Sequence, residues 1–189
     1  FLPGIVAAPE EGTIAAVCIL HGSGDHKGAY TWWMVDALLA ENIAVLLVDL
    51  DGHGENPRTQ QFPAILEDVS AATDYLRERY RRVGVLGISL GGCIAARAVA
   101  DGTPVDALVL MEAPPLLHFT RADMRREALA LAHWPAMQVF RNTSVHQIAD
   151  TWSTAPIRAA ISTWDLIAAL DLLGSVKRIQ APLFLLYGG

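Results

Sequence analysis

Short, uninterrupted apolar runs of strand length recur along this chain, separated by segments whose apolar residues have helical spacing. The runs occupy residues 13–20, 42–50, 82–88, 105–112 and 181–189. Continuous apolar strands are typical of a sheet that is buried on both faces, and strands that alternate with helices predict parallel pairing. We therefore expect an α/β fold, a single domain over residues 1–189 with a mostly parallel central sheet and helices on both faces.

Three intervening segments carry the helical spacing, at residues 29–41, 62–76 and 90–100, and a further short strand is expected within residues 1–8. In a parallel sheet of this kind ligands bind beyond the carboxyl ends of the strands. The loops that follow the strands are therefore the segments in which functional residues are expected.

Composition excludes several classes of protein. The longest apolar run, residues 14–20, is far shorter than the ~20 residues of a membrane-spanning helix. A net charge of −6 without a basic stripe argues against nucleic acid as a partner. The two cysteines, Cys18 and Cys93, lack metal-ligand spacing, and nothing else in the sequence implies a metal or an organic cofactor. Nothing in the sequence demands an oxidising compartment, and the start has no signal peptide, which favours a cytoplasmic location.

The interval between the last two predicted strands is too long for a simple crossover. It covers 69 residues, 113–181, and much of it is apolar with helix-like spacing. We interpret residues 114–162 as a helical cap inserted over the strand ends, before the last strand. The alternative is an ordinary helical excursion that packs elsewhere.

The stretch GISLGG places Ser89 between a predicted strand and a predicted helix, with Gly87 and Gly91 on either side. A serine on such a turn has a strained backbone, and its neighbours must be small to avoid clashes. Leu90 opens the helix, so its N–H is free to donate to an oxyanion. We predict that Ser89 is a nucleophile. The alternative is a serine that only caps the helix.

The glycine-rich loop LHGSG follows the strand at 13–20 and suits the second half of an oxyanion hole. Glycines let a backbone approach closely, so Ser23 is the expected second N–H donor, with Gly22 shaping the loop. We expect His21 to orient this loop rather than to act as the base. In the later loop DLDGHGEN, Asp49 and His53 are expected to hold the turn by hydrogen bonds.

Taken together, HGSG, DGHGEN, GISLGG and the cap before the last strand resemble the α/β-hydrolase fold superfamily in order and approximate spacing. The resemblance covers nearly the whole chain. It implies a serine hydrolase that uses Ser89, with the N–H groups of Leu90 and Ser23 as the oxyanion hole. A serine at this turn resembles the esterase, lipase and thioesterase members rather than the haloalkane dehalogenases.

The resemblance also implies an acid after the last strand and a histidine further on, whereas the sequence stops at Gly189. We therefore expect the domain to be incomplete at its C-terminus, with both residues beyond Gly189 and an apolar sheet edge left without its neighbour. Glu112, at the end of the strand at 105–112, is the alternative acid. Three histidines of the predicted cap are alternative bases: His118, His133 and His146.

The expected activity is hydrolysis of a carboxylic ester or thioester, a small-molecule acyl substrate, through an acyl-enzyme on Ser89. Acyl transfer or peptidase chemistry on the same site is an alternative. A non-catalytic binding module of the same fold is another, because the fold does not fix the function. The sequence leaves open whether the protein forms a homo-oligomer.

Overall fold

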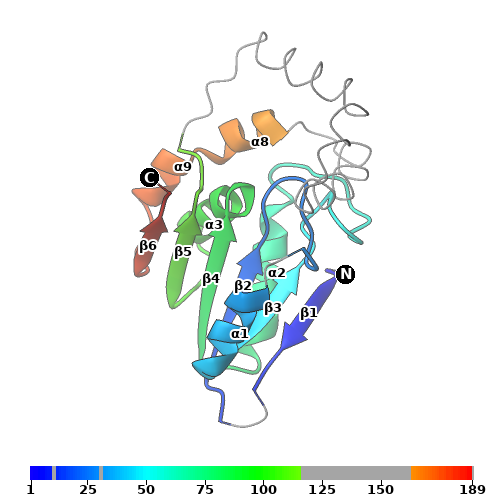
Figure 1. Cartoon of the computed structure of the whole chain (residues 1–189). Helices are drawn as coiled ribbons and strands as arrows, with labels where there is room; N and C mark the ends of the chain where they lie inside the picture. Colours follow the sequence, from blue (N-terminus) through cyan, green and yellow to red (C-terminus); the bar gives the residue numbers. More distant parts are fainter. Residues whose placement is uncertain (10–11, 30–31, 116–162, 189) are drawn as a thin grey trace.

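The computed structural model describes residues 1–9, 12–29, 32–115 and 163–188, and the predicted cap at 114–162 lies almost wholly outside them (Figure 1). Within these residues the chain forms a six-stranded sheet in the order β1-β3-β2-β4-β5-β6. Its strands are β1 (Gly4–Ala7), β2 (Ala15–Leu20), β3 (Ile43–Val48), β4 (Arg82–Ile88), β5 (Ala107–Met111) and β6 (Leu183–Leu186). Only β1 runs antiparallel to its neighbour, β3, so the prediction of a mostly parallel sheet is confirmed.

Helices cover both faces of the sheet, as predicted. They are α1 (Trp32–Ala40), α2 (Leu66–Arg77), α3 (Leu90–Ala100), α8 (Thr163–Leu170) and α9 (Leu172–Val176). On one face Val35 of α1 packs with Ile19, Val45 and Leu47 of the sheet. On the other face α2, α3, α8 and α9 enclose the larger core with side chains from β2 to β5. None of the described helices is long and apolar enough to cross a membrane.

The register of the parallel strands brings their carboxyl ends to one edge of the sheet. Leu20, the last residue of β2, pairs with Val48 at the end of β3 and with Gly87 near the end of β4. Ile88 of β4 pairs with Met111 of β5. The loops after these strands therefore meet at the same edge, which is the top of the sheet in Figure 1.

Helix α2 begins later than its apolar spacing predicts, at Leu66 rather than at residue 62. The preceding residues form a tight turn, because the N–H of Leu66 donates to the carbonyl of Pro63 over 3.0 Å and that of Glu67 to Ala64 over 2.9 Å. These bonds span three residues instead of four, so the regular α-helix starts only after them.

Strand β6 lies at the edge of the described sheet, beside β5. Its apolar side chains Phe184, Leu185 and Leu186 are exposed, as is Tyr187 just after it. The Tyr187 hydroxyl nevertheless donates a hydrogen bond of 2.7 Å to the carbonyl of Ala113, which ties the end of β6 to the segment after β5.

Candidate active site

Ser89 stands at the junction of β4 and α3 with φ 50° and ψ −114°, a conformation that residues with a side chain rarely adopt. Hydrogen bonds to strand β5 and within helix α3 hold this turn. The Ser89 N–H donates to the carbonyl of Met111 over 2.8 Å, and the Ser89 carbonyl accepts from the N–H of Gly92 at 3.0 Å and of Cys93 at 3.2 Å. Strain of this kind persists only where the surroundings over-determine it, and it concentrates at functional sites.

The glycines around Ser89 are needed on steric grounds. A Cβ on Gly87 would lie 2.5 Å from the carbonyl oxygen of Gly91, and a Cβ on Gly91 would lie 2.5 Å from the carbonyl oxygens of Leu20 and His21. Because all the opposing atoms belong to the backbone, no side-chain rotation relieves either clash. Strand β4, helix α3 and the end of β2 can approach this closely only with glycine at both positions.

The predicted oxyanion loop lies against the serine turn. A Cβ on Gly22 would lie 3.5 Å from the Cβ of Ser89, and the N–H of Gly91 donates to the carbonyl of His21 over 3.1 Å. Leu90 is the first residue of α3, so its N–H has no acceptor within the helix. Ser23 follows Gly22 directly, and its hydroxyl lies 3.2 Å from that of Thr163, the first residue of α8.

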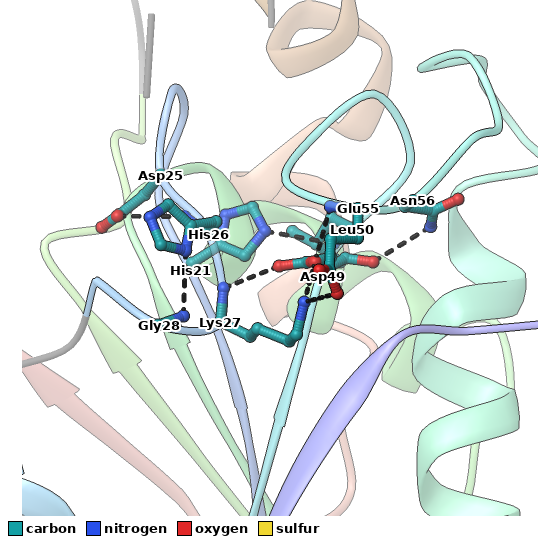
Figure 2. Close-up of polar contacts among 9 residues, drawn as sticks. All are labelled: His21, Asp25, His26, Lys27, Gly28, Asp49, Leu50, Glu55 and Asn56. Carbon is teal, nitrogen blue, oxygen red and sulfur yellow. Dashed lines mark hydrogen bonds and ion pairs between the residues drawn. The ribbon is translucent and has the colours of Figure 1, made fainter. Parts of the chain in front are cut away.

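His21 is buried at the base of this loop, and Figure 2 shows the hydrogen bond between its ring and the main chain of Leu50. Its Nε2 accepts a hydrogen bond from the N–H of Leu50 at 3.1 Å, so Nδ1 carries the proton and donates to the carbonyl of Gly22 at 2.8 Å. Burial, together with the charge of nearby His53, lowers the pKa of His21 to about 3. The ring is therefore neutral near pH 7, and its contacts are those of a residue that orients the loop.

Glu112 follows β5 directly and so stands at the strand end next to that of Ser89. Its backbone has φ 52°, and its N–H donates to the carbonyl of Leu186 over 2.7 Å. Its carboxylate oxygen Oε1 lies 3.4 Å from where a Cβ of Gly188 would be. The structure thus places Glu112 at the same edge of the sheet as Ser89. The three histidines of the predicted cap lie outside the described residues.

A polar network between the loop after β2 and the loop after β3 was not predicted from the sequence (Figure 2). Lys27 donates from its main-chain N–H to Asp49 Oδ1 at 2.7 Å and from its ammonium to Asp49 Oδ2 and Glu55 Oε2, both at 2.6 Å. Asp49 also accepts the N–H of Glu55 at 2.8 Å, and its carbonyl accepts Asn56 Nδ2 at 3.0 Å. The prediction that Asp49 holds its loop is confirmed. The one signal for Lys27 in the sequence is a cation inside the glycine-rich stretch HGSGDHKG.

In this network the opposite charges of Lys27 and Asp49 each stabilise the ionised form of the other. Burial alone would raise the pKa of Asp49, but the hydrogen bonds from Lys27 and Glu55 outweigh it and hold that pKa below its ordinary value. Partial burial acts to lower the pKa of Lys27, and the carboxylates of Asp49 and Glu55 reverse this and raise it. Both partners are therefore ionised at neutral pH.

A second charge cluster combines the buried carboxylates of Asp51 and Asp68 with the partly exposed guanidinium of Arg58. Nε of Arg58 lies 2.7 Å from Asp51 Oδ1, and the same guanidinium also pairs with Asp68. A weaker contact of 3.9 Å joins Nη1 of Arg58 to Glu67 Oε2. The N–H of Asp51 donates to Asp68 Oδ2 at 2.8 Å, and Asn56 donates to Asp51 Oδ1 at 3.1 Å. Burial and the neighbouring charge of Asp51 raise the pKa of Asp68 to about 7. The Arg58 guanidinium thus pairs with one carboxylate in the loop after β3 and with another on helix α2.

Comparison with known proteins gives the family. The family described as serine aminopeptidase, S33, matches residues 12–189, which is nearly the whole chain. The chain belongs to this family of α/β-hydrolases. The fold expected from the resemblance is therefore confirmed.

Individual relatives agree with this assignment. The chain is 31% identical to the pimeloyl-[acyl-carrier protein] methyl ester esterase of Chromobacterium violaceum, over 91% of this chain and 74% of that protein. It is 33% identical to the uncharacterized protein YfhR of Salmonella typhimurium, over 49% of this chain but only 32% of that protein. An esterase from Exiguobacterium antarcticum has the same fold, with a TM-score of 0.69 at 16% identity, over 97% of this chain and 75% of that one.

Proposed function

We propose that this protein is a serine hydrolase that cleaves a carboxylic ester or thioester through an acyl-enzyme on Ser89. The observation that carries the proposal is the strained Ser89 turn, built against a glycine loop at the carboxyl edge of the sheet. A serine that only caps a helix needs neither the positive φ nor the close packing of Gly87 and Gly91. Membership of the S33 family and the esterase name of a relative support the same chemistry.

In the proposed mechanism Oγ of Ser89 attacks the substrate carbonyl carbon while its proton passes to a general base. The negative charge on the former carbonyl oxygen is held by the N–H groups of Leu90 and Ser23. Collapse of the tetrahedral intermediate expels the alcohol or thiol, which takes the proton from the base. Water then attacks the acyl group, gives its proton to the base, and releases the acid as Ser89 regains a proton.

We propose the general base, and the acid that orients it, from the pattern of the family. We assign the base to a histidine outside the described residues. The acid is assigned to a residue that follows β6, with Glu112 as the alternative because it shares the edge of the sheet with Ser89. A cytoplasmic location also stays a prediction.

A peptidase is the second candidate function, because the description of the matching family names a serine aminopeptidase. The experiment compares turnover of an aryl ester, an acyl thioester and an aminoacyl anilide by the natural full-length protein and by its Ser89→Ala variant. We expect the ester or thioester to be turned over fastest and Ser89→Ala to be inactive on each. Preference for the anilide would establish the peptidase, and turnover that survives in Ser89→Ala would contradict the proposal.

A further inference from the structure

Two loops that approach the site are joined by a salt bridge that the chemistry above does not use. Lys27 belongs to the loop after β2, which contains Ser23, whereas Asp49 and Glu55 belong to the loop after β3. The Lys27 side chain is only 14% exposed and the Asp49 side chain is fully buried, while the Glu55 side chain is largely in solvent. The Lys27–Asp49 pair is therefore the protected part of this contact, and Glu55 adds an exposed partner.

The Asp49 carboxylate has little room to move. A Cβ on Gly54 would lie 2.3 Å from its Cγ, so the turn after β3 closes directly over the carboxylate. Both oxygens are also bonded to main-chain N–H groups, Oδ1 to Lys27 and Oδ2 to Glu55. Asp49 is thus a rigid anchor to which the backbone and the ammonium of Lys27 are both attached.

The oxyanion loop is anchored at its other end as well. His21 accepts from the N–H of Leu50, the residue after Asp49. Between the two anchors the N–H of Asp25 donates to the carbonyl of Gly22 over 3.3 Å, which closes a tight turn with Ser23 as its first central residue. The anchors at His21 and Lys27 therefore bracket the turn that carries the Ser23 N–H.

We infer that Lys27 is a positioning residue: its bridge to Asp49 fixes the turn at Ser23 so that the Ser23 N–H faces the oxyanion formed on Ser89. The inference rests on the proposed function, because it matters only if Ser89 forms a tetrahedral intermediate. Its effect is indirect, since Lys27 holds the loop from below and needs no contact with the substrate. An oxyanion donor is effective only when it is held in place before the reaction, and a small displacement costs a large factor in rate.

The test uses the natural full-length protein and replaces Lys27 with Met, which keeps the length of the side chain and removes its charge. Lys177 is the other lysine of the sequence and is exposed, so Lys177→Met is the matched control. We expect Lys27→Met to lower kcat on an aryl ester by ~10- to 100-fold with KM within about 3-fold. Lys27→Arg should recover much of this loss, because it restores the cation.

An alkylboronic acid separates positioning from general stability. It adds to an activated serine and places an oxygen where the oxyanion forms, so its inhibition constant should rise about as much as kcat/KM falls. If Lys27→Met folds poorly because it strands the Asp49 charge, the double variant Lys27→Met, Asp49→Asn removes that charge. The double variant should then fold and keep the raised inhibition constant. Its fold-loss in kcat/KM should be smaller than the product of the fold-losses measured for Lys27→Met and for Asp49→Asn.

Equal kcat and equal boronate inhibition in Lys27→Met and Lys177→Met, with an active wild type, would overturn this inference alone. A rise in KM at unchanged kcat would overturn it too, because it would assign Lys27 to substrate binding. A wild type that hydrolyses no ester and binds no boronate would overturn the proposed function, and this inference with it.

Discussion

The N–H of Gly91 donates a hydrogen bond to the carbonyl of His21 over 3.1 Å, and this bond joins the first turn of α3 to the start of the loop after β2, the proposed oxyanion loop. It spans 70 residues of sequence. The two segments can approach this closely because Gly91 has no Cβ, which would lie 2.5 Å from the carbonyl oxygen of His21. The serine turn and the loop opposite it are therefore one packed unit. A change that separates them should affect stability and activity together.

Gly87→Ala tests the close packing of β4 against α3 within the serine turn, with Gly84→Ala in the same strand as its control. The new methyl group at Gly87 would lie 2.5 Å from backbone atoms, whereas at Gly84 it would lie 3.4 Å from the carbonyl of Ala107, an ordinary contact. We expect Gly87→Ala to lower the free energy of unfolding by about 3 kcal/mol and Gly84→Ala by less than about 1 kcal/mol. Urea denaturation of both variants measures the difference. Equal losses would show that the turn adapts to a methyl group.

The strain at Ser89 predicts a stabilised but inactive variant. Ser89→Gly and Ser89→Ala both remove the hydroxyl, but only glycine accepts φ 50° and ψ −114° without steric cost. We expect Ser89→Gly to be about 1 kcal/mol more stable than Ser89→Ala, after its greater loss of backbone entropy is counted. Thermal denaturation of the two variants decides the matter. An alanine variant as stable as the glycine variant would mean that the turn stores no strain.

The carboxyl of Asp68 predicts a dependence of stability on pH. Its pKa in the folded protein, about 7, lies above the usual value of 3.8, so the folded state keeps a proton that the unfolded chain releases. The resulting stabilisation is full below about pH 4 and is lost as the pH rises through about 7. Asp68→Asn has no such proton to release. Its free energy of unfolding should therefore rise relative to that of the wild type as the pH increases over this range.

The comparison requires urea unfolding of both proteins between about pH 4 and pH 8. Asp74→Asn, which changes an exposed carboxylate on the same helix, serves as the control and should follow the wild type. Curves for Asp68→Asn and the wild type that stay parallel would contradict a raised pKa for Asp68.

Glu112→Gln separates the two proposals for the catalytic acid. We expect it to keep kcat within about 10-fold of the wild type, since we assign the acid to a residue after β6. Loss of the true orienting acid in a serine hydrolase lowers kcat by ~10⁴. Steady-state turnover of an aryl ester distinguishes these outcomes. A loss approaching that size, with an unchanged melting temperature, would transfer the role to Glu112.

The sequence predicted β4 and α3 to the residue, because the glycine-fenced turn at Ser89 marks where one ends and the other begins. It also predicted that the loops after the strands share one edge, which follows from parallel pairing alone. The start of α2 was placed four residues early, since apolar spacing does not distinguish a tight turn at Pro63 from the first turn of the helix.

The charge networks could not be predicted in the same way. The Lys27–Asp49 contact crosses 22 residues, and Arg58 reaches both Asp51 and Asp68. Such pairs depend on how loops of irregular backbone fold over one another, and neither periodicity nor a short motif specifies that. A charged residue inside a glycine-rich loop beside a buried strand is the pattern to examine in similar chains.

The central claim is that Ser89 is an activated nucleophile, and labelling of the natural full-length protein by a fluorophosphonate tests it most directly. Intact-mass measurement before and after the reagent, followed by peptide mapping, shows how many labels are added and where. The account predicts one label, on Ser89, and none on the Ser89→Ala variant. An unlabelled wild type, or a label on another residue that persists in Ser89→Ala, would contradict it.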